Sequence, residues 1–232
     1  MNIAICVFPG SNCERDCFHA AASVPGYRPC YVWHREERLP AADAVILPGG
    51  FSYGDYLRTG AIARQSPIIQ AVIDFAAAGG PVLGICNGFQ ILTEAGLLPG
   101  ALLRNASLQF ECRTVHLRVE QSDTPFTCAY PVGAIACMPT AHMDGNYYVD
   151  DAALRQLEAD HQIVFRYCTA AGEVTPAANP NGARANIAGV CNVRRNVVGL
   201  MPHPERCSEA LVGGTDGLGV FTSIGQWLRT RS

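Results

Sequence analysis

The chain has 232 residues, of which 49% are hydrophobic and 16% charged, and its net charge is −3. A chain of this size and composition can bury a full hydrophobic core, which excludes intrinsic disorder, collagen and coiled coil. The weak and evenly spread negative charge argues against an electrostatic surface for nucleic acid or anionic membranes. Small polar substrates and protein partners fit better, and we expect one domain over residues 1–232.

The N-terminus and the cysteines predict a cytoplasmic protein. No run approaches the roughly 18 apolar residues that span a bilayer, and residues 1–10 lack the basic leader of a signal peptide. The eleven cysteines are an odd number, and several stand inside apolar runs, which favours reduced, packed thiols over a disulfide framework. Cys13 and Cys17 have helical spacing, but no second pair at zinc spacing accompanies them, so we expect no metal site.

Apolar runs alternate with helical stretches along the N-terminal part of the chain. The expected strands are residues 2–8, 31–33, 44–47 and 82–85. The expected helices are residues 13–22, residues 68–78 and a third that begins at residue 88. Because these strands are apolar on both faces and alternate with helices, they predict a parallel sheet covered by helices.

The pattern changes beyond residue 102. Residues 114–119 (TVHLRV) alternate between apolar and polar, which predicts an antiparallel extension of the sheet. Residues 175–182 (TPAANPNG) predict a loop between two strands, and a strand at 197–201 with a helix at 217–229 returns the chain to the core. The expected fold is therefore a three-layer α/β fold: a mostly parallel open sheet with helices on both faces and an antiparallel extension.

Residues 81–90 (PVLGICNGFQ) carry the strongest chemical signal. A buried strand runs into G-x-C-x-G and then into a helix, which is the arrangement of a nucleophile elbow with Cys86 in place of serine. Side chains at Gly84 or Gly88 would collide with the neighbouring strand or helix. The helix N-terminus favours a thiolate, and the N–H of Asn87 would face a developing oxyanion. One more buried thiol is the alternative for Cys86, but strand, glycines and helix together favour a nucleophile.

Among the six histidines, His203 has the position expected of a base. Residues 202–206 (PHPER) follow the strand at 197–201, and ligands of open α/β sheets bind at the carboxyl ends of strands. Glu205 is placed to accept the imidazole N–H and orient the ring. Alone, the two residues could be a solvated loop pair. Together with the elbow they predict a catalytic triad of Cys86, His203 and Glu205.

A second glycine-rich turn covers residues 47–56 (LPGGFSYGDY) after the strand at 44–47. It matches neither the P-loop pattern nor the dinucleotide-binding pattern, so support for a nucleotide site is weak. A simpler interpretation is that the backbone N–H of Gly50 is the second donor of an oxyanion hole, beside that of Asn87.

Three segments together resemble the class I, or triad, glutamine amidotransferases. They are residues 84–90 (GICNGFQ), 48–50 (PGG) and 202–206 (PHPER). Longer strings resemble one branch of that family more closely, the glutaminase subunits that serve a synthetase of purine biosynthesis. These strings are residues 9–13 (PGSNC), 49–58 (GGFSYGDYLR) and 201–206 (MPHPER), and the similarity extends from about residue 2 to residue 228.

The resemblance implies a reaction in two parts. Glutamine is hydrolysed through a γ-glutamyl thioester on Cys86, and the ammonia passes to a separate synthetase subunit. That partner uses ATP and Mg to activate an amide, whereas this chain needs no cofactor or metal of its own. A small auxiliary subunit is implied as a further partner.

The same resemblance implies which residues bind glutamine. They are Gly49, Gln90, Ser107, Leu108, Gln109, Phe110, His142 and Met143. After His142 the chain departs from the family pattern, because residues 143–145 read MDG where Gly-Glu-Gly is usual. A methionine at this position opposes close backbone approach to the amino-acid end of glutamine, or means that the loop reshapes when the partner docks.

Other functions share parts of this pattern. A stand-alone cysteine hydrolase of related fold would have the strand, cysteine and helix, but it would need neither residues 202–206 nor a partner. A regulatory or interaction domain on the same fold would be expected if the nucleophile or the base were missing, and both are present. A glutaminase subunit of another amidotransferase is the third alternative. A glutaminase assay of the chain alone, and then with a synthetase, separates enzyme, hydrolase and binding module.

Overall fold

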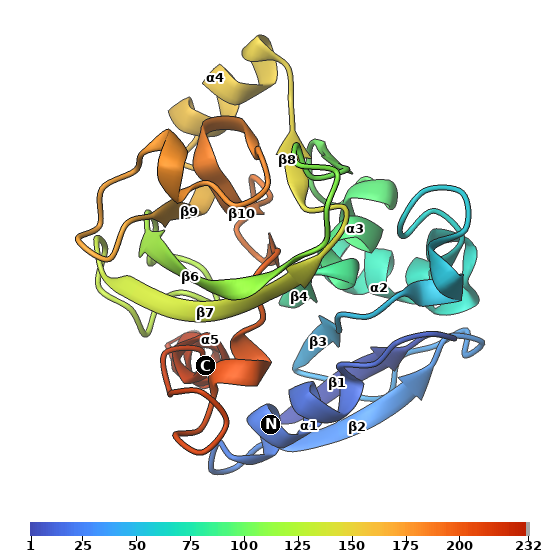
Figure 1. Ribbon diagram of the computed structural model, residues 1–232. Coiled ribbons are helices and arrows are strands. Elements are labelled where there is room, and N and C mark those ends of the chain that lie inside the picture. The colour runs from blue at the N-terminus through green and yellow to red at the C-terminus, as the bar shows by residue number, and fades with distance from the viewer. Residues whose placement is uncertain (231–232) are drawn as a thin grey trace.

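The structure, a computed structural model, describes residues 1–230 (Figure 1). Its strands are β1 (Asn2–Val7), β2 (Arg28–Trp33), β3 (Ala44–Leu47), β4 (Val82–Ile85), β5 (Ala101–Leu103), β6 (Glu111–Val119), β7 (Ile135–His142), β8 (Asn146–Tyr148), β9 (Ile163–Cys168), β10 (Ile187–Cys191) and β11 (Val197–Leu200). Its helices are α1 (Glu14–Ala22), α2 (Pro67–Ala77), α3 (Asn87–Glu94), α4 (Asp151–Ala159) and α5 (Leu218–Arg229), and the short 3-10 turns include η1 (Ser52–Asp55) and η5 (Pro204–Cys207). A nine-stranded sheet has the order β2-β1-β3-β4-β11-β10-β9-β6-β7, and β5 pairs separately with β8.

Strands β2, β1, β3, β4 and β11 form the parallel half of the sheet. Every residue of β3, β4 and β11 is buried, as their continuous apolar sequences predict. The chain runs from β1 through α1 to β2, and from β3 through α2 to β4, and these two crossovers proceed in opposite directions along the sheet. Right-handed connections therefore place α1 and α2 on opposite faces of the sheet. This divergence leaves a crevice at the carboxyl ends of β1 and β3, where open α/β sheets bind their ligands.

Strands β10, β9, β6 and β7 form the antiparallel half. The predicted antiparallel extension is confirmed, with Glu111 of β6 opposite His142 of β7 and Arg118 opposite Ile135. Figure 1 shows β6 and β7 as long, arched strands. Although β7 is the edge strand, the N–H of His203 beyond β11 donates to the carbonyl of Pro139 in β7 at 2.8 Å. The antiparallel half therefore reaches the edge at which the parallel strands end.

The structure also contains elements that the sequence did not indicate. Helix α4 begins at a capped end, where the N–H of Ala153 donates to the carboxylate of Asp150 at 2.8 Å, but only Leu157 of the helix is fully buried. With one fully buried residue, the helix has too narrow an apolar face for its sequence to show clear helical periodicity. Strands β5 and β8 are too short to show alternation.

Two expectations from composition can be compared with the structure. All eleven cysteines are free thiols and most are buried, as predicted from their place in apolar runs. Within residues 1–230, no helix combines the length and the apolar character that crossing a lipid bilayer requires.

Candidate active site

Three predicted site residues, together with Cys13, lie at the carboxyl ends of four adjacent parallel strands. Cys13 follows β1, Gly50 follows β3, Cys86 follows β4 and His203 follows β11. All four line one cavity of about 250 Å³. The other residues that line this cavity are Asn12, Phe51, Phe110, Ala141 and Arg206.

Cys86 has the backbone conformation of an elbow. Its φ of 49° and ψ of −104° lie outside the regions that a non-glycine residue ordinarily occupies. The N–H of Cys86 donates to the carbonyl of Leu200 in β11 at 2.8 Å, and the N–H of Gln90 donates to the carbonyl of Cys86 at 3.1 Å to open α3. A cysteine that only fills a strand needs no such strain, so the backbone favours the elbow over the buried-thiol alternative, and the role of Cys86 as nucleophile remains a prediction.

The glycines on either side of Cys86 allow strand and helix to approach each other. A Cβ atom on Gly88 would lie 1.9 Å from the carbonyl oxygen of Leu47 in β3. A Cβ atom on Gly84 would lie 2.5 Å from Leu92 and 2.7 Å from the backbone of Gly88 in α3. The collisions predicted from the sequence are therefore confirmed for both glycines.

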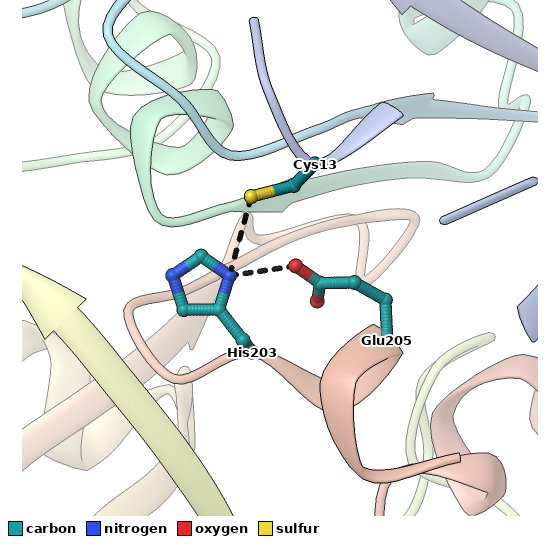
Figure 2. A group of neighbouring side chains, drawn as sticks. All are labelled: Cys13, His203 and Glu205. Carbon is teal, nitrogen blue, oxygen red and sulfur yellow. Dashed lines mark hydrogen bonds and ion pairs between the residues drawn. The ribbon is translucent and has the colours of Figure 1, made fainter. Parts of the chain in front are cut away.

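His203 and Glu205 form a buried pair (Figure 2). The Nδ1–H of His203 donates to Oε1 of Glu205 at 2.6 Å, while Nε2 is buried and has no hydrogen-bond partner within residues 1–230. Burial alone lowers the pKa of His203, but the Glu205 carboxylate, then Cys86 and Cys13, raise the pKa well above its ordinary value. The imidazole is therefore held with Nδ1 protonated and Nε2 available in the cavity.

The sequence analysis predicts the backbone N–H groups of Gly50 and Asn87 as oxyanion donors. The antiparallel bridge between Ser11 and Gly50 uses the N–H groups of Phe51 and Asn12, so the N–H of Gly50 takes no part in it. Asn87 is the first residue of α3 and has no helical carbonyl one turn earlier to receive its N–H. Among residues 1–230 the backbone geometry is thus compatible with the predicted donors, and the oxyanion role of Gly50 and Asn87 remains a prediction.

The residues expected to bind glutamine occupy different environments. Gly49 lies against the base, because a Cβ atom there would be 2.7 Å from Cε1 of His203, and Phe110 lines the cavity. The side chain of Gln90 is buried and engaged: it donates to the carbonyl of Asp144 at 2.7 Å and accepts from Asn87 at 2.8 Å. Gln90 therefore holds the loop after β7 against α3.

His142 ends β7 and Met143 begins the loop that follows, and an amide network binds both residues to the protein. The ring nitrogens of His142 pair with Asn105 at 3.1 Å and with Asn181 at 3.4 Å, and the carbonyl of Met143 accepts from the N–H of Asn105 at 2.9 Å. Burial, and then the charge of His203, lower the pKa of His142 to about 4. The sequence analysis missed Asn105 and Asn181, and nothing in their local sequence distinguishes them from loop asparagines.

Ser107, Leu108 and Gln109 are exposed on the loop between β5 and β6. Leu108 has a φ of 56° and is 70% exposed. None of the three lines the cavity in the part of the chain that the structure describes, so their predicted contact with glutamine remains a prediction.

Cys13 is a second thiol in the cavity that the sequence analysis did not assign to the reaction. Its Sγ, a ring nitrogen of His203 and a carboxylate oxygen of Glu205 lie within 4.8 Å of one another, a donor set that soft cations accept. Protein groups already engage these donors: Nδ1 of His203 donates to Glu205, and Nη2 of Arg206 contacts the sulfur at 3.0 Å. The expectation of no metal remains a prediction.

The whole length of the chain is similar to known proteins of one family. The family described as the CobB/CobQ-like glutamine amidotransferase domain matches residues 1–216. The chain belongs to this family. It is 58% identical over 227 residues to the phosphoribosylformylglycinamidine synthase subunit PurQ of Moorella thermoacetica, covering 98% of this chain and 96% of that protein. It is also 58% identical over 225 residues to PurQ of Rhodospirillum rubrum, covering 97% and 98%.

A solved structure gives the same result. PurLQS from Thermotoga maritima contains a chain that is 45% identical, with a TM-score of 0.86 and coverage of 98% of both chains. The family inferred from the motifs is thereby confirmed, down to its PurQ branch. The α/β fold with a parallel sheet and an antiparallel extension is confirmed as well.

Proposed function

We propose that this chain is the glutaminase subunit of phosphoribosylformylglycinamidine synthase. One observation carries the chemistry: Cys86, strained at its elbow, shares a cavity with His203, whose Nδ1 is held by Glu205 at 2.6 Å. A thiol nucleophile, a base and an orienting carboxylate are what hydrolysis of an amide requires. Similarity to PurQ subunits over nearly the whole chain supports the assignment to this synthase.

The first half of the reaction forms a thioester. The Cys86 thiolate attacks the γ-carbonyl carbon of glutamine, and the N–H groups of Gly50 and Asn87 stabilise the oxyanion. The C–N bond then breaks, and His203 gives a proton from Nε2 to the leaving nitrogen, which departs as ammonia. Glu205 keeps the ring oriented and stabilises its charged form throughout.

The second half returns the enzyme to its starting state. His203, now neutral at Nε2, takes a proton from water as the water oxygen attacks the thioester carbon. The C–S bond breaks, glutamate leaves, and the proton on His203 restores the ion pair with the Cys86 thiolate. Each turnover thus converts glutamine and water to glutamate and ammonia with no cofactor in this chain.

We propose that the synthetase subunit of the same enzyme consumes the ammonia. It would use ATP and Mg to convert formylglycinamide ribonucleotide to formylglycinamidine ribonucleotide in purine biosynthesis, with a small auxiliary subunit in the assembly. The structure of PurLQS from Thermotoga maritima, which contains the similar chain, supports such partners. Exposed apolar side chains near the cavity also support a surface that a partner covers. Leu108 is 70% exposed, and Phe51 and Phe110, which line the cavity, are 42% and 46% exposed.

Three further features belong to this proposal. Gly49, Gln90, Phe110 and the loops at 107–109 and 142–143 bind or position glutamine, with Gln90 acting through the loop after β7. Residues 1–232 act as one domain, since the nine-stranded sheet takes its strands from both ends of the chain. The location is the cytoplasm, where eleven free thiols stay reduced.

The test uses the chain assembled with its synthetase partner. Cys86→Ala and Cys86→Ser should abolish glutamine-dependent synthesis and leave ammonia-dependent synthesis intact, because the acceptor chemistry belongs to the partner. Loss of both activities would contradict the assignment. Hydrolysis of peptides or esters by the isolated chain, without glutamine turnover in the complex, would favour the stand-alone hydrolase instead.

A further inference from the structure

We infer that Cys13 and Arg206 are positioning residues for the base, and that the Cys13 sulfur holds the imidazole of His203 in register with Glu205. The inference rests on the proposed glutaminase function. It concerns a buried thiol that none of the reaction steps uses, in the PGSNC string after β1. Neither Cys13 nor Arg206 forms or breaks a bond with substrate in this scheme.

The position of the Cys13 sulfur is fixed by the backbone around it. Cys13 stands immediately before α1 and is 1% exposed. Its N–H donates to the carbonyl of Gly49 at 3.2 Å, and its carbonyl accepts from the N–H of Cys17 at 3.0 Å. These two bonds tie Cys13 both to the glycine turn after β3 and to the first turn of α1, so the sulfur has little freedom to move.

The sulfur and Glu205 meet the same nitrogen of the base (Figure 2). Cys13 Sγ lies 3.9 Å from Nδ1 of His203, and Glu205 Oε1 lies 2.6 Å from it. The glycine turn closes the space on this side, because a Cβ atom on Gly49 would be 2.7 Å from Cε1 of His203 and 3.1 Å from Cys13 Sγ. The ring is therefore confined by a sulfur, a carboxylate and a glycine backbone.

The hydrogen bonds of Cys13 are consistent with a neutral thiol. Its S–H donates to Oδ1 of Asn12 at 3.2 Å, and its sulfur accepts from Nη2 of Arg206 at 3.0 Å. Burial raises the pKa of Cys13, which opposes formation of a second thiolate beside Glu205. Cys13 is thus poorly suited to attack substrate, and its sulfur is an acceptor that also faces the Nδ1–H of His203.

Arg206 connects this sulfur to the turn that carries Glu205. Arg206 follows Glu205 directly in η5, and its Nε pairs with Oδ2 of Asp16 in α1 at 3.4 Å. The guanidinium therefore bridges η5 to α1 while it donates to Cys13. A shift of η5 relative to α1 would change the Glu205–His203 geometry, and Arg206 opposes that shift through two contacts.

The size of sulfur matters for this role. A hydrogen bond to a hydroxyl oxygen is shorter than one to sulfur. Because Cys13 Sγ lies 3.9 Å from Nδ1 of His203, a serine oxygen at position 13 would be too far away to keep both the ring and Arg206 as partners. Serine preserves part of the polar contact, whereas alanine preserves none. We therefore expect Cys13→Ser to have a smaller effect on kcat than Cys13→Ala, and neither substitution changes a residue of the proposed triad.

The experiment measures glutamine-dependent and ammonia-dependent synthesis by the assembled enzyme with Cys13→Ala, Cys13→Ser and Arg206→Lys. We expect kcat for glutamine to fall roughly ten- to a hundredfold in Cys13→Ala, since a misplaced catalytic group costs about that much, and to fall less in Cys13→Ser. KM for glutamine and the ammonia-dependent rate should stay near wild type. Cys13→Ala combined with Arg206→Lys should cost less than the two separate effects predict.

A pH profile separates positioning from mere stabilisation. The groups that face His203 are Glu205, Cys86, Cys13 and His142. Because Cys13 helps to raise the pKa of His203, the limb of the kcat/KM profile that reports this histidine should move to lower pH in Cys13→Ala. Cys17→Ala is the matched control: this thiol is buried one turn along the same helix, so its loss should lower the melting temperature without moving the limb.

The outcomes distinguish failure of the positioning role from failure of the proposed glutaminase function. A wild-type complex that hydrolyses glutamine, with a Cys13→Ala variant of unchanged kcat and pH limb, would overturn the positioning role and leave the glutaminase function standing. A wild-type complex without glutamine-dependent activity would overturn both. If Cys13→Ala does not fold, Cys13→Ser and Arg206→Lys take its place. A kcat for glutamine and a pH limb unchanged from wild type in both variants would then overturn the positioning role.

Discussion

The parallel and antiparallel halves of the sheet build the cavity in different ways. In the parallel half, Gly50, Cys86 and His203 stand on turns directly after β3, β4 and β11, and backbone geometry fixes their positions. In the antiparallel half, the loop after β7 is held by the side-chain amides of Asn105 and Asn181. The proposed reactive groups thus lie on short turns, of which the one at Cys86 is strained, and a polar network holds the segments that contribute Phe110 and Ala141 to the cavity.

The difference follows from the connections of the two halves. Parallel strands bring their carboxyl ends to one edge, so turns after neighbouring strands meet without further help. The loops between β5 and β6 and between β7 and β8 have no such constraint. Asn105 supplies one: its Nδ2 donates to the carbonyl of His142 at 2.9 Å, and its Oδ1 accepts from the N–H of Gly145 at 3.0 Å.

The largest effect is expected at the elbow of the parallel half. Gly88→Ala should lower the free energy of unfolding by at least about 4 kcal/mol and abolish glutamine hydrolysis, because its Cβ would lie 1.9 Å from the carbonyl oxygen of Leu47. Chemical denaturation and the glutaminase assay measure both effects. Gly133→Ala is the control: its φ of 81° strains an alanine, but among the residues described nothing lies within 4 Å of the added atom. It should cost about 1–2 kcal/mol.

The next effect concerns the pH dependence of the antiparallel half. His142 is buried, and its folded-state pKa of about 4 lies below its usual value of 6.5. The neutral ring therefore contributes stability that is present above pH 6.5 and is lost as the pH falls through 4. The loss should reach about 3 kcal/mol. Denaturation midpoints between pH 7 and pH 4 should converge for wild type and His142→Gln as the pH falls.

A smaller effect is expected when the amide network is broken. Asn105→Ala leaves the N–H of Gly145 and the carbonyl of His142 without their side-chain partner and should cost about 2 kcal/mol. Because the network holds the wall and the proposed nucleophile lies elsewhere, KM for glutamine should rise more than kcat falls. A kcat loss as large as that of Cys86→Ala, with unchanged KM, would contradict this division between the halves.

The smallest effect is expected where the two halves meet. Burial, then the charge of Asp144, raise the pKa of Asp55 from 3.8 to about 6. Stability from the protonated carboxyl is full below pH 3.8 and is lost as the pH rises through 6, so Asp55→Asn should be more stable than wild type at pH 8. Since Asp55 is partly exposed, solvent screening reduces the gain to about 1 kcal/mol. An equal gain at pH 3.5 would show that the charge is not its cause.

The parallel half of the sheet, and the proposed reactive groups on its turns, could be predicted from the chain alone. Continuous apolar strands, glycine turns and the strings around Cys86 and His203 are local patterns, and together they favour one interpretation over the alternatives for each. The carboxyl edge of a parallel sheet then brings separate turns together without any knowledge of side-chain contacts. For that reason the elbow, the two glycine collisions and the family could be predicted from the chain alone.

Only the tertiary structure decided how the rest of the cavity is closed. Cys13 and Arg206 stand 193 residues apart in the sequence, and their contact depends on how η5 packs against α1. The partners of His142 come from loops 37 and 39 residues away, and any loop asparagine could have supplied them. Such contacts have no local signature, because they arise from the packing of segments far apart in the chain and not from the conformational preference of any one segment.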